Sequence, residues 1–84
     1  MALVEWDIEA RETLRKLPKL ISKRIYKKIT KEIASHPDRY LETLVNANFF
    51  KIRIGDYRLF VNYDEKKDHL IIRSMSHRRN SYKW

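Results

Sequence analysis

One stretch of alternating apolar and basic residues, divided by the only glycine in the chain, constrains the fold more than any other feature. The segment Phe49–Tyr63 has the pattern of a strand, a two-residue turn and a second strand. Gly55-Asp56 is typical of a two-residue hairpin loop, because glycine readily adopts the left-handed backbone that such loops need. This loop predicts four cross-strand pairs: Ile54–Tyr57, Arg53–Arg58, Ile52–Leu59 and Lys51–Phe60.

Alternation along the two strands assigns each side chain to one face of the sheet. Six residues share the face that we expect to pack beneath helices: Phe50, Ile52, Ile54, Tyr57, Leu59 and Val61. The other face carries Lys51, Arg53, Arg58 and Phe60, with no acidic residue among them. Like charges placed directly opposite each other are destabilising, so the pair Arg53–Arg58 is either solvated or part of an anion site.

A third strand is expected over residues 70–76, after a polar connector. If Lys66-Lys67 forms the tip of the turn, Val61 pairs with Ile72 and Phe60 pairs with Arg73. Four residues of this strand and its end then join the face of Lys51: Ile71, Arg73, Met75 and His77. Phe60 and Met75 would offer a stacking surface for a base, unless the C-terminal tail covers them.

The first half of the chain has the pattern of one strand and two helices. Ala2–Trp6 is short and apolar, and Asp7 suits the N-cap of a helix over Ile8–Leu17. Pro18 favours the start of a second helix, which we expect to reach Ser35. Along it, isoleucine recurs every four residues, and lysine or arginine fills the opposite side: Ile21, Ile25, Ile29 and Ile33.

These elements predict an α+β domain of the order β-α-α-β-β-β, with an N-terminal αα-hairpin packed on one face of a mainly antiparallel sheet. The length of 84 residues predicts a single domain over residues 1–84, too small for a nucleotide-binding doubly wound fold. The chain has no cysteine, which excludes disulfides, thiolate zinc sites and cysteine catalysis. No segment has the length of a membrane span or the pattern of a signal peptide, so we expect a cytoplasmic protein.

The net charge of +8 indicates an acidic partner. Arginine binds phosphate through two parallel hydrogen bonds and lysine acts as a point charge, so the basic face of the hairpin predicts a phosphate site. The three histidines lack the spacing of metal ligands, and we expect neither a metal site nor a cofactor.

The hairpin and the end of the chain resemble the RelE family of toxins, in the RelE/ParE superfamily of toxin–antitoxin systems. The resemblance rests on two motifs, Phe50-Lys51-Ile52-Arg53-Ile54-Gly55-Asp56-Tyr57-Arg58 and Ser76-His77-Arg78-Arg79 followed by Tyr82. It extends over nearly the whole chain, because the order of strands and helices also agrees. It implies a metal-independent endoribonuclease that cleaves mRNA in the ribosomal A site and so inhibits translation.

The resemblance also implies roles for individual residues. Lys51 and Arg53 would hold the phosphate while the ribose 2′-OH attacks it, and Arg58 would stabilise the charge on its oxygens. Arg78 would support the leaving 5′-oxygen, and Tyr82 would stack on a base, orient it or act as the general base. His77 stands where some relatives have lysine and is a candidate acid or base. Further RNA contacts are expected at Phe60, Arg73, Arg79 and Lys83.

Two other functions stay open on the sequence alone. A ParE-like relative would inhibit DNA gyrase without cleaving RNA, although such relatives are expected to lack the basic set just named. A non-catalytic RNA-binding module would keep the basic face without the chemistry. The toxin family further implies a cognate antitoxin, and the positive charge predicts an acidic segment in it.

Overall fold

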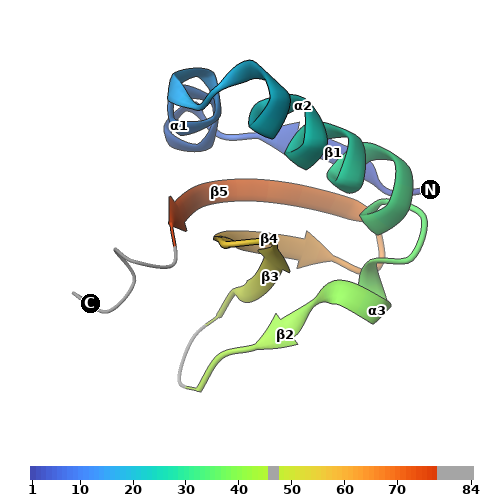
Figure 1. The fold of residues 1–84 in the computed structure, drawn as a ribbon. Helices are drawn as coiled ribbons and strands as arrows, with labels where there is room; N and C mark the ends of the chain where they lie inside the picture. Colours follow the sequence, from blue (N-terminus) through green and yellow to red (C-terminus); the bar gives the residue numbers. More distant parts are fainter. Residues whose placement is uncertain (46–47, 78–84) are drawn as a thin grey trace.

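The computed structural model describes residues 1–45 and 48–77, which form two layers (Figure 1). The strands form one sheet in the order β1-β5-β4-β3-β2. Their bounds are Leu3–Trp6 for β1, Glu42–Thr43 for β2, Phe50–Ile54 for β3, Tyr57–Asp64 for β4 and His69–His77 for β5. Helices α1 (Ile8–Lys16) and α2 (Lys19–Lys27) cover one face of this sheet together with the π-helix η1 (Lys28–Ile33). We call the opposite face the outer face.

The predicted fold class is confirmed. Strand β1 runs parallel to β5, and the other three strand pairs are antiparallel. Two short elements were not predicted, the helix α3 (Pro37–Tyr40) and the two-residue strand β2. A strand this short has too few residues to show alternation, so only its pairing with β3 defines it.

The first two helices begin where the sequence predicts. The Asp7 side chain accepts a hydrogen bond of 2.9 Å from the backbone N–H of Ile8, and α1 follows directly. Pro18 then occupies the cap position of α2 in an extended conformation. The αα-hairpin therefore follows from local signals in the sequence, a carboxylate cap and a proline.

The second helix changes its winding at Lys28, and this change was not predicted. In an α-helix, four residues turn about 40° more than a full circle, so a four-residue repeat drifts around the helix. The segment η1 is wound as a π-helix, and the backbone N–H of Ala34 donates to the carbonyl of Ile29 at 2.9 Å. This wider turn takes up the drift, and Ile25, Ile29 and Ile33 are all at most 1% exposed.

The β3–β4 hairpin has the predicted register. All four predicted pairs are present, and Gly55 has a φ of +59°, in the left-handed region. The expected core residues Ile52, Ile54, Leu59 and Val61 are buried against the isoleucines of the second helix and against Leu70 and Ile72 of β5.

The predicted register of β5 is correct only as far as Ile72. Val61 pairs with Ile72, but Phe60 lies opposite Ser74, because a β-bulge leaves Arg73 as an extra residue in β5. Alternation beyond the bulge is therefore inverted. Met75 pairs with Leu59 and is buried, and His77 pairs with Tyr57 on the side of the helices. The prediction that Met75 and His77 join the face of Lys51 is wrong, and Ser74 and Ser76 lie there instead.

None of the helices within the described residues is long and apolar enough to cross a membrane.

Candidate functional site

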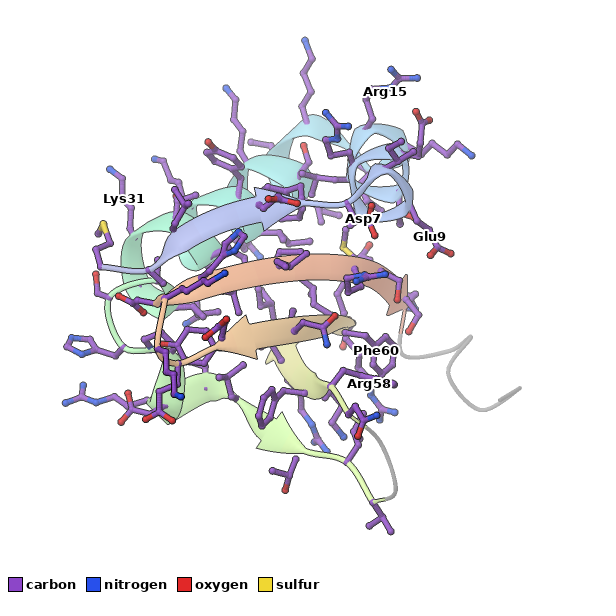
Figure 2. The ribbon with its side chains drawn as sticks, turned by 180° about the vertical axis from the view of Figure 1, so that it is seen from behind. Asp7, Glu9, Arg15, Lys31, Arg58 and Phe60 are labelled. Carbon is purple, nitrogen blue, oxygen red and sulfur yellow. The ribbon has the colours of Figure 1, made fainter. Side chains whose placement is uncertain are left out.

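Three basic side chains lie together on the outer face of the hairpin, and we call them the cationic face: Lys51, Arg53 and Arg58. Strand β3 supplies Lys51 and Arg53 two residues apart, and β4 places Arg58 directly opposite Arg53. Phe60 lies opposite Lys51 and close to Arg58 (Figure 2). The predicted juxtaposition of these four residues is confirmed.

The cationic face has an acidic neighbour that the sequence did not reveal. Strand β2 places Glu42 opposite Lys51, and a Glu42 carboxylate oxygen lies 3.3 Å from the Arg53 Nε. The expectation that no acid lies on this face is therefore wrong. Both side chains of this ion pair are about half exposed, so water weakens it. Within residues 1–45 and 48–77, neither Lys51 nor Arg58 forms an ion pair with a carboxylate.

A small hollow of about 160 Å³ opens at the tip of the hairpin. Arg53 and Arg58 line it together with the turn residues Gly55 and Asp56 and with Tyr57. Two guanidinium groups at one concave site can approach the oxygens of a single phosphate, which makes the hollow suitable for an anion.

A larger cleft of about 550 Å³ adjoins the cationic face on the outer face of the sheet. Phe60 and Ser76 line it, and they lie opposite Lys51 and Arg58 in the strand ladders. Phe49 meets Phe60 edge to face, with ring centroids 5.9 Å apart. Leu44, Met75 and Glu9 complete much of the remaining wall. The cleft therefore combines an aromatic wall with polar groups close to the cations.

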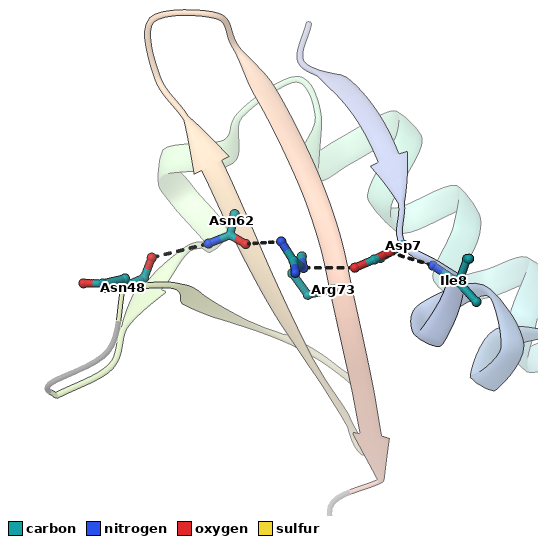
Figure 3. Close-up of polar contacts among 5 residues, drawn as sticks. All are labelled: Asp7, Ile8, Asn48, Asn62 and Arg73. Atoms are coloured by element: carbon teal, nitrogen blue, oxygen red, sulfur yellow. Dashed lines mark hydrogen bonds and ion pairs between the residues drawn. The ribbon is translucent and has the colours of Figure 1, made fainter.

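Arg73 belongs to a chain of polar contacts that crosses the outer face (Figure 3). Its Nε lies 3.1 Å from an Asp7 carboxylate oxygen, and its Nη1 donates to the Asn62 side-chain oxygen at 3.3 Å. The Asn62 amide in turn donates to the backbone carbonyl of Asn48. Arg73 thus links the start of α1 to β4 and to the segment before β3. This bonding leaves its guanidinium less available for the RNA contact expected from the sequence.

The other predicted site residues divide into two groups. His77 lies on the helix side of the sheet, where its ring meets the Tyr57 ring edge to face at 5.0 Å. Arg78, Arg79, Tyr82 and Lys83 lie outside the described residues. Within the described part of the chain, no group of three or more histidine, aspartate or glutamate side chains is arranged to hold a metal ion.

Sequence reasoning missed three features of this region, namely Glu42, Phe49 and the hydroxyl of Ser76. Glu42 is isolated in an irregular segment, and Ser76 changes face only because of the bulge in β5. Phe49 opens the predicted hairpin segment but lies one residue before β3, and its contact with Phe60 depends on the path of the chain there. No sequence signal identified these positions.

Comparison with known proteins matches most of the chain to one family of toxins. Residues 4–82 match the model of the ParE toxin of the type II toxin–antitoxin system parDE. No curated protein matches the sequence.

Several solved structures share the fold. The RelBE2 toxin–antitoxin complex from Mycobacterium tuberculosis contains a chain that is 28% identical, with a TM-score of 0.85 over 92% of this chain and 98% of that one. The intact E. coli RelBE complex gives 21% identity and a TM-score of 0.73, over 92% and 96% of the two chains. The RelB–RelE complex from Methanococcus jannaschii gives 22% and 0.71, over 95% and 96%.

Proposed function

We propose that this chain, which belongs to the ParE toxin family of type II toxin–antitoxin systems within the RelE/ParE superfamily, is a toxin that cleaves mRNA on the ribosome. The single observation that carries the proposal is the cationic face, where the sheet holds Lys51, Arg53 and Arg58 together. A like-charge pair directly across two strands is costly to the fold, and binding of a phosphate offsets that cost. The similarity to a RelE toxin of a RelBE complex supports the same activity.

The proposed reaction is an internal transfer at the phosphate. The 2′-oxygen of a ribose forms a bond to the adjacent phosphorus while the bond from phosphorus to the 5′-oxygen breaks. The 2′-OH gives up its proton and the 5′-oxygen gains one, so the products are a 2′,3′-cyclic phosphate and a 5′-hydroxyl. Negative charge grows on the non-bridging oxygens in the transition state, and fixed cations stabilise it.

The three side chains of the cationic face are not equally available to a phosphate. Lys51 and Arg58 lack an ion pair with a carboxylate among the described residues, so their charges are available to a phosphate. Arg53 contacts Glu42, and a phosphate has to compete with that carboxylate for its guanidinium. We therefore assign the main stabilisation of the transition state to Arg58 and the binding of the phosphate to Lys51 and Arg53. Arg78 and Tyr82 are proposed to complete the site.

The partner that we propose is a cognate antitoxin with an acidic segment. The similar chains from Mycobacterium tuberculosis, E. coli and Methanococcus jannaschii come from complexes with RelB antitoxins. A net charge of +8 on 84 residues favours association with an acidic chain.

A translation reaction with purified components tests the proposed activity. The chain is added to translating ribosomes, and the mRNA ends are mapped by primer extension. Cuts at fixed positions within codons, with cyclic phosphate ends, are the expected result, and addition of the antitoxin should abolish them.

A second function, inhibition of DNA gyrase, should be tested with the same purified protein, because the matching family model describes a ParE toxin. Inhibition of DNA gyrase supercoiling with intact mRNA would replace the proposed activity with a ParE-like one. Binding to ribosomes with neither effect would leave an RNA-binding module.

A further inference from the structure

We propose that the cleft beside the cationic face binds one unstacked base of the RNA whose phosphate that face holds. The inference deepens the proposed function and rests on it, because it assumes that the partner of the cationic face is RNA. It assigns to the cleft a role in choosing where the RNA is bound.

The cleft lies next to the side chains that would hold the phosphate. Phe60 and Ser76 line the cleft, and their partners across the strands are Lys51 and Arg58. A nucleotide bound through its phosphate at Lys51 and Arg58 therefore has its base within reach of this cleft. The volume of about 550 Å³ lies within the range of sites that bind small organic groups.

The wall of the cleft contains two aromatic rings that suit a base. Phe60 is partly exposed on the outer face, and Phe49 supports its ring edge to face. Aromatic rings on a sheet beside cations are the usual platform for bases of single-stranded RNA. The bulge in β5 also brings two serines beside this ring, because it turns Ser74 and Ser76 to the outer face.

The hydroxyl of Ser76 indicates that the cleft binds a base and not an apolar side chain. Its oxygen is buried and makes no hydrogen bond with any residue in the described part of the chain. Buried hydroxyl groups nearly always have a partner, so an orphaned one at a cleft points to a ligand. A base edge offers both donors and acceptors, whereas the apolar side chain of a protein partner would leave the hydroxyl unpaired.

Glu9 adds a preference among bases. Glu9 lines the cleft, and an ionised carboxylate can only accept hydrogen bonds. Cytosine presents an amino group where uracil presents a carbonyl, so the carboxylate favours cytosine between these two rings of equal size. Guanine and adenine also carry amino groups and fit the same description.

Binding of short RNA to the full chain tests the proposal. The probes are single-stranded hexanucleotides with 2′-O-methyl riboses, which block cleavage, measured by fluorescence anisotropy at low salt. In each probe one nucleotide is made abasic, so that every phosphate is kept and a single base is lost. At one position the abasic change should weaken binding by about tenfold, the effect expected for one stacked base.

Three variants show whether that base lies in the cleft. In Phe60→Leu and Ser76→Ala, the intact probe should bind more weakly and the abasic penalty at that position should largely disappear. Ser76→Ala should melt at the same temperature as the parent chain or higher, because the lost hydroxyl has no hydrogen-bond partner within residues 1–45 and 48–77. Ser35→Ala, on the helix side of the molecule, serves as the matched control and should change neither quantity. Glu9→Gln should remove the difference between cytidine and uridine.

Each contrary outcome has a definite meaning. If every position tolerates the abasic change, or if the penalty is unchanged in Phe60→Leu, the cleft proposal is wrong although the cationic face still binds RNA. If these variants weaken binding of the antitoxin and leave RNA binding unchanged, the cleft is a protein docking site and the proposal is overturned. If the intact probe does not bind, the cleft proposal is wrong, and the cleavage assay on ribosomes decides the proposed function separately. Base-dependent binding without cleavage on ribosomes would refute the proposed function and keep the cleft assignment.

Discussion

Replacement of Arg58 should change the stability of the fold and the rate of the proposed reaction in opposite directions. Arg58→Gln removes the charge and keeps part of the stem, whereas Arg58→Lys keeps the charge and removes the planar fork. Arg58 lies directly opposite Arg53 in the hairpin, and like charges in that position destabilise a sheet by about 0.2–1 kcal/mol. Glu42 lies 3.3 Å from Arg53 and offsets part of this repulsion, so the lower half of that range applies.

Arg58→Gln should therefore raise the free energy of unfolding by about 0.2–0.5 kcal/mol, or about 1–4 °C in melting temperature for a domain of this size. The gain should fade in 1 M salt, where the screening length is about 3 Å. The same variant should lower the rate of mRNA cleavage by about 100- to 1000-fold, the usual loss when one group that stabilises transition-state charge is removed. Arg58→Lys should keep the parental stability and still cleave slowly.

The assay pairs thermal melts at low and high salt with single-turnover cleavage on programmed ribosomes. Arg24→Gln is the matched control, because it removes one arginine charge from the exposed side of α2, away from the hairpin. It should change cleavage only slightly. Cleavage within threefold of the parent in Arg58→Gln would refute the role of Arg58. A clear loss of stability in that variant would refute the reasoning about the like-charge pair.

Three further predictions concern the fold. Gly55→Ala should lower the melting temperature by about 4–8 °C, which corresponds to roughly 1 kcal/mol of left-handed backbone strain. A new Cβ at this position meets nothing within 4 Å, so the strain is the expected cause. Gly55→Asn should lower the melting temperature less, and an equal decrease in both variants would contradict a purely conformational cause. Ile29→Ala should cost about 2–5 kcal/mol in urea denaturation, because Ile29 is fully buried within η1, and a loss below 1 kcal/mol would show that the helix repacks. The hydrogen bond from Tyr63 to the Asp68 carboxylate, 2.6 Å long, raises the pKa of Tyr63 to about 12. Its stabilising effect should be complete below pH 10 and disappear as the pH rises through 12; absorbance titration should show one tyrosine ionising near pH 12 in the parent and none in Tyr63→Phe.

The hairpin shows how far local sequence can determine structure. One glycine, one turn pair and strict alternation fixed the register of β3 and β4, and with it the neighbours Lys51, Arg53, Arg58 and Phe60. The Asp7 cap and Pro18 fixed the starts of α1 and α2 in the same way. These features depend on residues close together in the chain, and the backbone preferences of those residues are known.

The bulge in β5 marks the limit of that reasoning. One extra residue at Arg73 moved Met75 and His77 to the helix side and brought Ser74 and Ser76 to the outer face. The pattern of β5 does change phase, since strict alternation from Ile72 would turn Ser74 and Ser76 toward the helices and Met75 outward, but only the pairing with β4 places the extra residue at Arg73. The bonds from Arg73 to Asp7 and Asn62 exist only in the folded sheet.

The sequence by itself determined the class of fold, the two helices, the hairpin register and the presence of a basic patch on one sheet face. Only the tertiary structure decided which other groups share that face, namely Glu42 beside Arg53, the Phe49–Phe60 pair and the hydroxyl of Ser76. The physical reason is the range of the interactions. Turns, caps and alternation act over a few residues, whereas a bulge, a two-residue edge strand and a cleft result from packing between segments far apart in the chain.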